Sequence, residues 1–183
     1  MIVLSADPSL RHTGLVALAR GRSWRWLGGL NSHTSTKLSD SEALRQHRRY
    51  LAALVTDDAV REWLQRGPAV VAIEAQGGVE QGKGRTARTN ERARFCDRVA
   101  WQLEGVAVDL GLQVVWVQPR SRLKAIGLPP KATKKDVIAR VERLVTGLPA
   151  VSTQKDAEPR ADAIAVGIAG YTKWMRLGAR RGV

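Results

Sequence analysis

Four acidic residues stand where carboxylates are expected to cluster. Asp7 and Glu74 each end a short apolar segment typical of a strand, in a chain that is otherwise rich in cations. If these strands are neighbours in parallel positions, both carboxylates lie at the same edge of a sheet. Glu158 and Asp162 are four residues apart at the start of the last predicted helix, so they share a face. Such a cluster of like charges is unstable unless cations compensate it.

A divalent metal centre is the chemistry that this cluster favours. Carboxylate oxygens suit Mg²⁺, and two ions ~4 Å apart activate a water and stabilise the leaving oxygen in phosphodiester cleavage. Three of these acids also have a simpler explanation. Asp7 precedes Pro8 and fits a turn, Glu74 fits a surface acid at a strand end, and Glu158 fits a helix start. Asp162 has small and apolar neighbours that indicate a packed segment, and the combination favours the metal site.

The apolar pattern predicts the elements that position these acids. Three strands with short turns come first, and two further strands are each reached through a helix, which predicts an α/β fold with a mixed five-stranded sheet flanked by helices. The strands are expected at residues 2–6, 15–19, 24–27, 69–73 and 114–117, with 24–27 at an edge. Helices are expected after Ser39 up to Gly67, at about 89–110, after Thr133, and from Pro159. Glu42 and Asp136 stand at capping-box spacing from Ser39 and Thr133.

Composition favours a nucleic-acid partner. The 183 residues fit one domain (1–183), with 30 Lys+Arg against 17 Asp+Glu and a net charge of +13 spread along the chain. An anionic membrane is the weaker candidate, because no helix is basic on one face and bulky-apolar on the other. The single Cys96 excludes an internal disulfide and a cysteine zinc cluster. No apolar run approaches the ~18 residues of a membrane span, so we expect a protein of the cytoplasm, bacterial or phage-infected.

Motifs at residues 2–14, 70–74 and 160–169 follow one another along nearly the whole chain. In this order they resemble the motifs of RuvC-type crossover-junction endonucleases. Residues 2–14 are similar to the opening motif, in which an aspartate (here Asp7) ends a strand and a glycine follows. Residues 70–74 resemble the second motif, a strand closed by a glutamate, and residues 160–169 resemble the last motif, a helix with the final aspartate. The resemblance implies a ribonuclease H-like fold and metal-dependent resolution of Holliday junctions, and of other branched DNA, by paired nicks. It implies that Asp7, Glu74 and Asp162 bind two Mg²⁺ or Mn²⁺ ions.

The fourth acid departs from the family pattern. The family places an acid or a histidine three residues before the last aspartate, where this chain has Pro159, which cannot ligate a metal. Glu158 is the nearest substitute, and Asp156 is the alternative.

The resemblance also supplies candidate DNA-binding cations. Residues 123–124 and 131–137 are similar to the segment that brings lysines to the scissile phosphate. Lys124 and Lys134 are therefore expected to contact phosphate or to stabilise the transition state, with Lys135 as the alternative to Lys134 and Lys131 beside them. A solvated basic face remains the simpler explanation.

A second departure follows Glu74. Cellular family members carry an aromatic wedge just beyond this glutamate, whereas here Ala75 is followed by Gln-Gly-Gly. We expect Lys83, Arg85 and Arg88 of this loop to grip DNA backbones instead. The hypothesis is weaker discrimination between Holliday junctions and other branches, as in the phage-encoded part of the family.

The resemblance implies a homodimer. The helix at about 89–110, which includes Trp101, is the expected interface. The alternative is that the apolar stripe of this helix packs only in the core. Lys173, Arg176, Arg180 and Arg181 are expected to add backbone contacts.

Three other functions are compatible with parts of this sequence. A non-catalytic nucleic-acid binder of this fold predicts loss of an acid, yet Asp7, Glu74 and Asp162 are all present. A sugar-kinase or actin-like ATPase needs a glycine after the first aspartate and two lobes, so Pro8 and the short chain argue against a nucleotide cofactor. A nuclease for structured RNA stays open.

Overall fold

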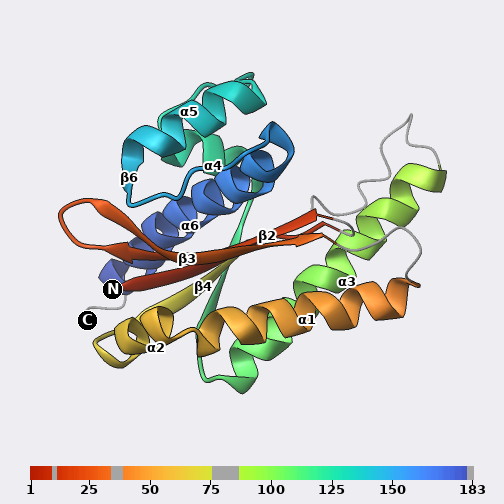
Figure 1. Cartoon of the computed structure of the whole chain (residues 1–183), viewed down its shortest axis with the longest axis horizontal. Helices are drawn as coiled ribbons and strands as arrows, with labels where there is room; N and C mark the ends of the chain where they lie inside the picture. The colour runs from red at the N-terminus through yellow and green to blue at the C-terminus, as the bar shows by residue number, and fades with distance from the viewer. Residues whose placement is uncertain (10–11, 34–38, 76–86, 181–183) are drawn as a thin grey trace.

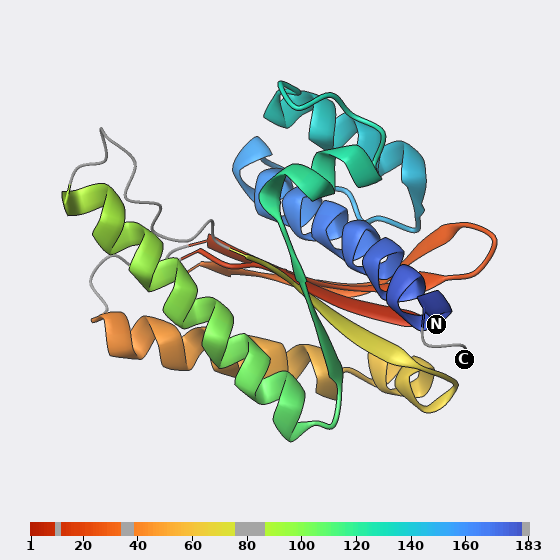
Figure 2. The ribbon, with the colours of Figure 1, turned by 180° about the vertical axis from the view of Figure 1, so that it is seen from behind.

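The computed structural model describes residues 1–9, 12–33, 39–75 and 87–180, and has three layers, with one sheet between two layers of helices (Figure 1). Helices α1 (Asp40–Thr56), α2 (Asp58–Gln65) and α3 (Ala87–Asp109) cover one face. Helices α4 (Pro119–Ala125), α5 (Lys134–Leu144) and α6 (Gln154–Arg180) cover the other, as the view from behind also shows (Figure 2). The expected α/β fold with a mixed sheet flanked by helices is confirmed.

The sheet has six strands in the order β5-β4-β1-β2-β3-β6, one more than expected. Strands β1 (Ile2–Asp7), β2 (His12–Arg20) and β3 (Trp24–His33) form the antiparallel meander. Strands β4 (Ala69–Glu74) and β5 (Gln113–Val117) extend it in parallel beside β1. The additional β6 (Val145–Thr146) pairs with the start of β3, so the segment 24–27 is not the edge strand that we expected. Two residues are too few to show alternation in a sequence.

The helix boundaries differ from the expectation at three points. The helix after Ser39 is broken at Asp57, whose carboxylate accepts a hydrogen bond from Val60 N (3.3 Å) and opens α2. Helix α4 was not expected. Helix α6 begins at Gln154 rather than at Pro159, because Thr153 caps it by accepting from Asp156 N (3.2 Å). The two capping boxes, at Ser39 and Thr133, are confirmed.

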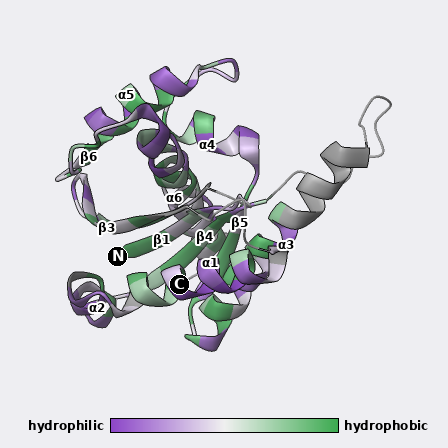
Figure 3. Ribbon diagram, turned by 45° about the vertical axis from the view of Figure 1, so that its right-hand side comes forward, coloured by the Kyte–Doolittle hydropathy of each residue, from purple (hydrophilic) through white to green (hydrophobic). Residues whose placement is uncertain are grey.

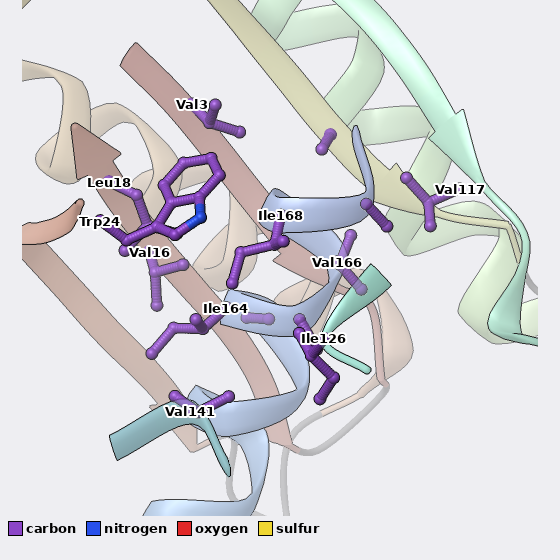
Figure 4. Close-up of a cluster of buried hydrophobic side chains, with 14 of the residues drawn as sticks. Val3, Val16, Leu18, Trp24, Val117, Ile126, Val141, Ile164, Val166 and Ile168 are labelled. Carbon is purple, nitrogen blue, oxygen red and sulfur yellow. The ribbon is translucent and has the colours of Figure 1, made fainter. Parts of the chain in front are cut away.

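Each face of the sheet has its own hydrophobic cluster, since alternate strand residues point to opposite faces. Figure 3 shows β1 and β4 as mostly hydrophobic strands between helices that carry hydrophilic residues. On the α6 face, Val3, Val16 and Leu18 pack under Ile164 and Ile168 (Figure 4). In the described part of the chain, no helix is both long and apolar enough to cross a membrane.

Helix α6 lies close to the sheet, because its inward residues are small. A Cβ atom on Gly170 would lie 2.3 Å from the Cβ of Ala72, so only glycine fits there. Nearer the start of the helix, Ser5 Oγ donates a hydrogen bond of 2.8 Å to Ala163 O. These contacts fix the height and the rotation of α6 above β1 and β4.

Candidate functional site

Asp7 and Glu74 come together through the register of two parallel strands. Val3 of β1 pairs with Val70 of β4, and each acid stands four residues further along its strand. Both valines pack in the cluster beneath α6, and four residues is an even step, so both carboxylates face α6. The sheet therefore places the two acids at one edge, as the sequence predicted.

Asp162 reaches the same place from α6, where it is buried. The helix can approach at this level because β2 carries Gly14 opposite Asp7. A Cβ atom on Gly14 would lie only 2.1 Å from Pro159 O and 3.1 Å from the Cβ of Ala163. The glycine that follows Asp7 in the opening motif thus makes room for the helix that carries the third acid.

Arg122 of α4 joins the three carboxylates. Its Nη1 lies 3.2 Å from Glu74 Oε1, 3.5 Å from Asp162 Oδ1 and 3.8 Å from Asp7 Oδ2. Arg122 is not among the residues predicted from the sequence, which indicated Lys124, two positions later. Its place follows from the strand pairing: Val117, at the end of β5, pairs with Glu74, so the residues that follow β5 lie near the acids.

The electrostatic environment disfavours the charged form of these acids, above all of Asp7. Burial raises the pKa of Asp7 well above its ordinary value, a hydrogen bond with the Glu74 carboxyl raises it further, and so do the charges of Glu74 and Asp162; Arg122 acts in the opposite direction. Glu74 Oε1, Asp162 Oδ1 and Arg122 Nε are buried and have no hydrogen-bond partner. One guanidinium therefore compensates the three carboxylates only in part.

The donor set fits a hard divalent cation. Carboxylate oxygens are the ligands that Mg²⁺ and Mn²⁺ take, and two of the buried oxygens have no hydrogen bond to lose. Within the described residues, however, no three histidine, cysteine or carboxylate side chains are already grouped as ligands of one ion. The acids face the guanidinium of Arg122, so metal binding requires local rearrangement.

The two candidates for a fourth acid form hydrogen bonds with residues at the start of α6. Glu158 Oε1 accepts a hydrogen bond of 2.9 Å from Gln154 Nε2, and among the described residues it forms no ion pair with Arg122. Asp156 Oδ2 accepts a hydrogen bond of 2.7 Å from Thr153 Oγ1 at the start of α6. The structure brings together three of the four acids that the sequence singled out.

The cations that were expected to bind DNA lie on several different elements. Lys134, the first residue of α5, forms an ion pair with Asp162 Oδ2. Lys124, Lys131 and Lys135 are exposed on α4, on the loop before α5, and on α5. Lys173 and Arg176 are exposed on α6, where Lys173 Nζ donates a hydrogen bond of 2.8 Å to Trp116 O. The other candidates lie outside what the structure describes, either as whole residues (Lys83, Arg85, Arg181) or in their side chains (Arg88, Arg180).

Comparisons with known proteins rest on structure alone, since no family model and no curated protein matches the sequence. RuvC from T. thermophilus in complex with a Holliday junction substrate is 22% identical, with a TM-score of 0.72 over 97% of this chain and 96% of that chain. A second Thermus thermophilus RuvC structure is 23% identical, with a TM-score of 0.68 over 97% of each chain. The yeast mitochondrial Holliday junction resolvase is 9% identical, with a TM-score of 0.53 over 99% of this chain and 86% of that chain. The chain therefore has the ribonuclease H-like fold of RuvC.

Proposed function

We propose that this protein is a divalent-metal-dependent endonuclease that resolves Holliday junctions, and related branched DNA, by paired phosphodiester nicks. The observation that carries the proposal is the convergence of Asp7, Glu74 and Asp162 on one nitrogen, Arg122 Nη1, at the edge of the sheet. These acids are far apart in sequence and bury their charge at a cost, and a structural role alone gives no reason to bring them together. We propose that such an enzyme acts in a bacterial cytoplasm or in a phage-infected host.

The side chains of the cluster have distinct roles in this proposal. Asp7, Glu74 and Asp162 would hold Mg²⁺ or Mn²⁺, two ions per site, and Glu158 would complete the ligand set by turning from Gln154. When bound, two such ions supply an activated water and stabilisation of the leaving oxygen. Lys134, which is 49% exposed in its side chain, would leave Asp162 to contact the phosphate under attack.

DNA is the substrate that the charge favours. The net charge of +13 attracts a polyanion, and Lys124, Lys131 and Lys135 are exposed on the elements that flank the acids. We propose that these lysines, together with Lys83, Arg85 and Arg88, bind phosphates of the junction arms. That T. thermophilus RuvC is seen with a Holliday junction supports the choice of branched DNA.

A homodimer would place two such sites across a two-fold junction. The apolar stripe of α3, including Val99 and Leu103, packs in the core, which was the alternative that the sequence left open. The same helix nevertheless exposes two large hydrophobic residues on its outer side, Trp101 (69%) and Val108 (62%). We propose that this outer face of α3, rather than the stripe, is the dimer interface.

The decisive experiment is cleavage of a labelled synthetic four-way junction with and without Mg²⁺. We expect paired symmetric nicks that disappear without the metal and in Asp7→Asn, while Asp109→Asn, a surface acid on α3, nicks normally. Three-way, flap and four-way RNA substrates in parallel measure the selectivity. Binding without nicking by the unmodified protein would instead identify a non-catalytic junction binder and overturn the proposal.

A further inference from the structure

Arg122 is a cation at the centre of the acid cluster. Its Nη1 contacts a carboxylate oxygen of Asp7, Glu74 and Asp162, each at 3.8 Å or less. Its side chain is only 18% exposed, and it comes from α4, which follows directly on the strand beside β4. The guanidinium therefore occupies the region where the three acids would share a divalent ion.

The fit of this guanidinium is loose. Its one hydrogen bond within the described cluster runs from Nη1 to Glu74 Oε2 at 3.3 Å, whereas charge-assisted hydrogen bonds are usually about 2.7–2.9 Å long. Arg122 Nε, Glu74 Oε1 and Asp162 Oδ1 are buried without a hydrogen-bond partner. A divalent ion binds carboxylate oxygens at roughly 2.0–2.1 Å and leaves no room for Nη1 between them.

Lys134 differs from Arg122 in this respect. It contacts only Asp162, through Oδ2, and about half of its side chain is exposed, so it can turn toward solvent or DNA while the acids stay in place. Arg122 contacts two buried carboxylate oxygens, Glu74 Oε1 and Asp162 Oδ1. The next residue, Leu123, packs against the hydrophobic core. Movement of Arg122 is therefore coupled directly to occupation of the cluster.

We infer that Arg122 is an internal counterion that competes with the divalent cation for Glu74 and Asp162, and thereby sets the metal affinity of the site. This inference rests on the proposed function, because it concerns the same metal site. In the metal-free protein the guanidinium offsets repulsion among the acids. When a divalent ion binds, the guanidinium must withdraw, since two cations that share the same oxygens repel each other strongly. Arg122 is thus a residue that tunes the site, distinct from its ligands.

Calorimetric titration with Mn²⁺ tests this inference without reference to cleavage. Arg122→Gln should bind Mn²⁺ about tenfold more tightly than the unmodified protein, because a positive charge a few ångströms from the ion has been removed. Arg120→Gln, an exposed position on the same helix, controls for the loss of one charge and should bind as the unmodified protein does. Arg122→Gln should also unfold at a lower temperature without metal and regain stability when Mn²⁺ is added.

A second measurement uses the unmodified protein, in case Arg122→Gln does not fold. The ¹⁵N–¹H signal of Arg122 Nε, assigned with Arg122→Lys, should shift in proportion to saturation with Mg²⁺. Equal or weaker Mn²⁺ binding by a folded Arg122→Gln, or a constant Nε signal at saturation, overturns the inference. If the unmodified protein nicks junctions in that case, the proposed function stands. If neither the unmodified protein nor Arg122→Gln binds the metal, both the inference and the proposed function are overturned.

Discussion

Lys134 and Asp162 form an ion pair that joins the first turn of α5 to α6. The lysine contacts Oδ2, while Oδ1 of the same carboxylate faces Arg122. One buried aspartate therefore contacts two cationic side chains from two helices. Of these two cations, only Lys134 is at the surface. This difference separates a cation that can reach the substrate from one that cannot.

Lys134→Gln should lower the rate of junction nicking by roughly a hundredfold or more, the usual effect of removing a group that stabilises charge in the transition state. Junction affinity should fall much less, because many other cations contact the backbone. Single-turnover cleavage and gel shift measure the two effects separately. Lys135→Gln, the exposed neighbour on the same turn, is the control, and a larger loss of rate in Lys135→Gln would reverse the two assignments.

Asp7→Asn should make the metal-free protein more stable near neutral pH. Burial and the acids around it raise the pKa of Asp7 above its ordinary 3.8, so the folded state retains a proton that the unfolded state has lost. Stability then falls as the pH rises from the ordinary pKa toward the raised one, and the loss persists above it. The asparagine variant avoids this loss, and its advantage should disappear in acid.

Thermal unfolding in a chelator, from about pH 4 to about pH 8, measures this difference. Excess Mg²⁺ should reverse it, because the ion stabilises only the protein that keeps the Asp7 carboxylate. Asp109→Asn on the surface should show neither effect. An Asp7→Asn variant that is less stable at neutral pH without metal would contradict the electrostatic account.

The convergence of the acids could be predicted because it follows from short-range rules. Apolar segments that end in Asp7 and Glu74 are recognisable one at a time, and parallel neighbours must end at the same edge. The capping boxes at Ser39 and Thr133 are equally local, since the partner residues are three positions apart.

Arg122 could not be predicted in the same way, because α4 gives little signal. The helix has seven residues, none of them fully buried, and its N-cap Gln118 makes no side-chain capping bond. A helix of only one or two turns is too short to show a periodic pattern of apolar residues in the sequence. The position of Arg122 depends instead on the pairing of β5 with β4, which is a long-range contact that the sequence does not state.

Glu158→Gln should affect metal-dependent nicking far less than Asp162→Asn. Asp162 is buried in the cluster, whereas Glu158 is partly exposed and accepts a hydrogen bond from Gln154. We expect the Glu158 variant to need more Mg²⁺ and then to approach the normal rate, while the Asp162 variant stays inactive at any concentration. The rate as a function of Mg²⁺ concentration measures both. Equal and irreversible losses would make Glu158 a full member of the site.

Gly14→Ala tests whether the close approach of α6 positions the acids. The added Cβ atom would lie 2.1 Å from the backbone oxygen of Pro159, so α6 must move away from β2 and take Asp162 with it. Overpacking of this kind costs about 1–3 kcal/mol, and roughly 2–4 °C in melting temperature per kcal/mol for a chain of this length. Nicking, measured well below the melting temperature, should fall by more than the loss of folded protein explains. Gly21→Ala, in the turn between β2 and β3, adds the same methyl group to open space and should change neither property. Normal nicking by Gly14→Ala would mean that the site tolerates displacement of α6, and that the glycine serves packing alone.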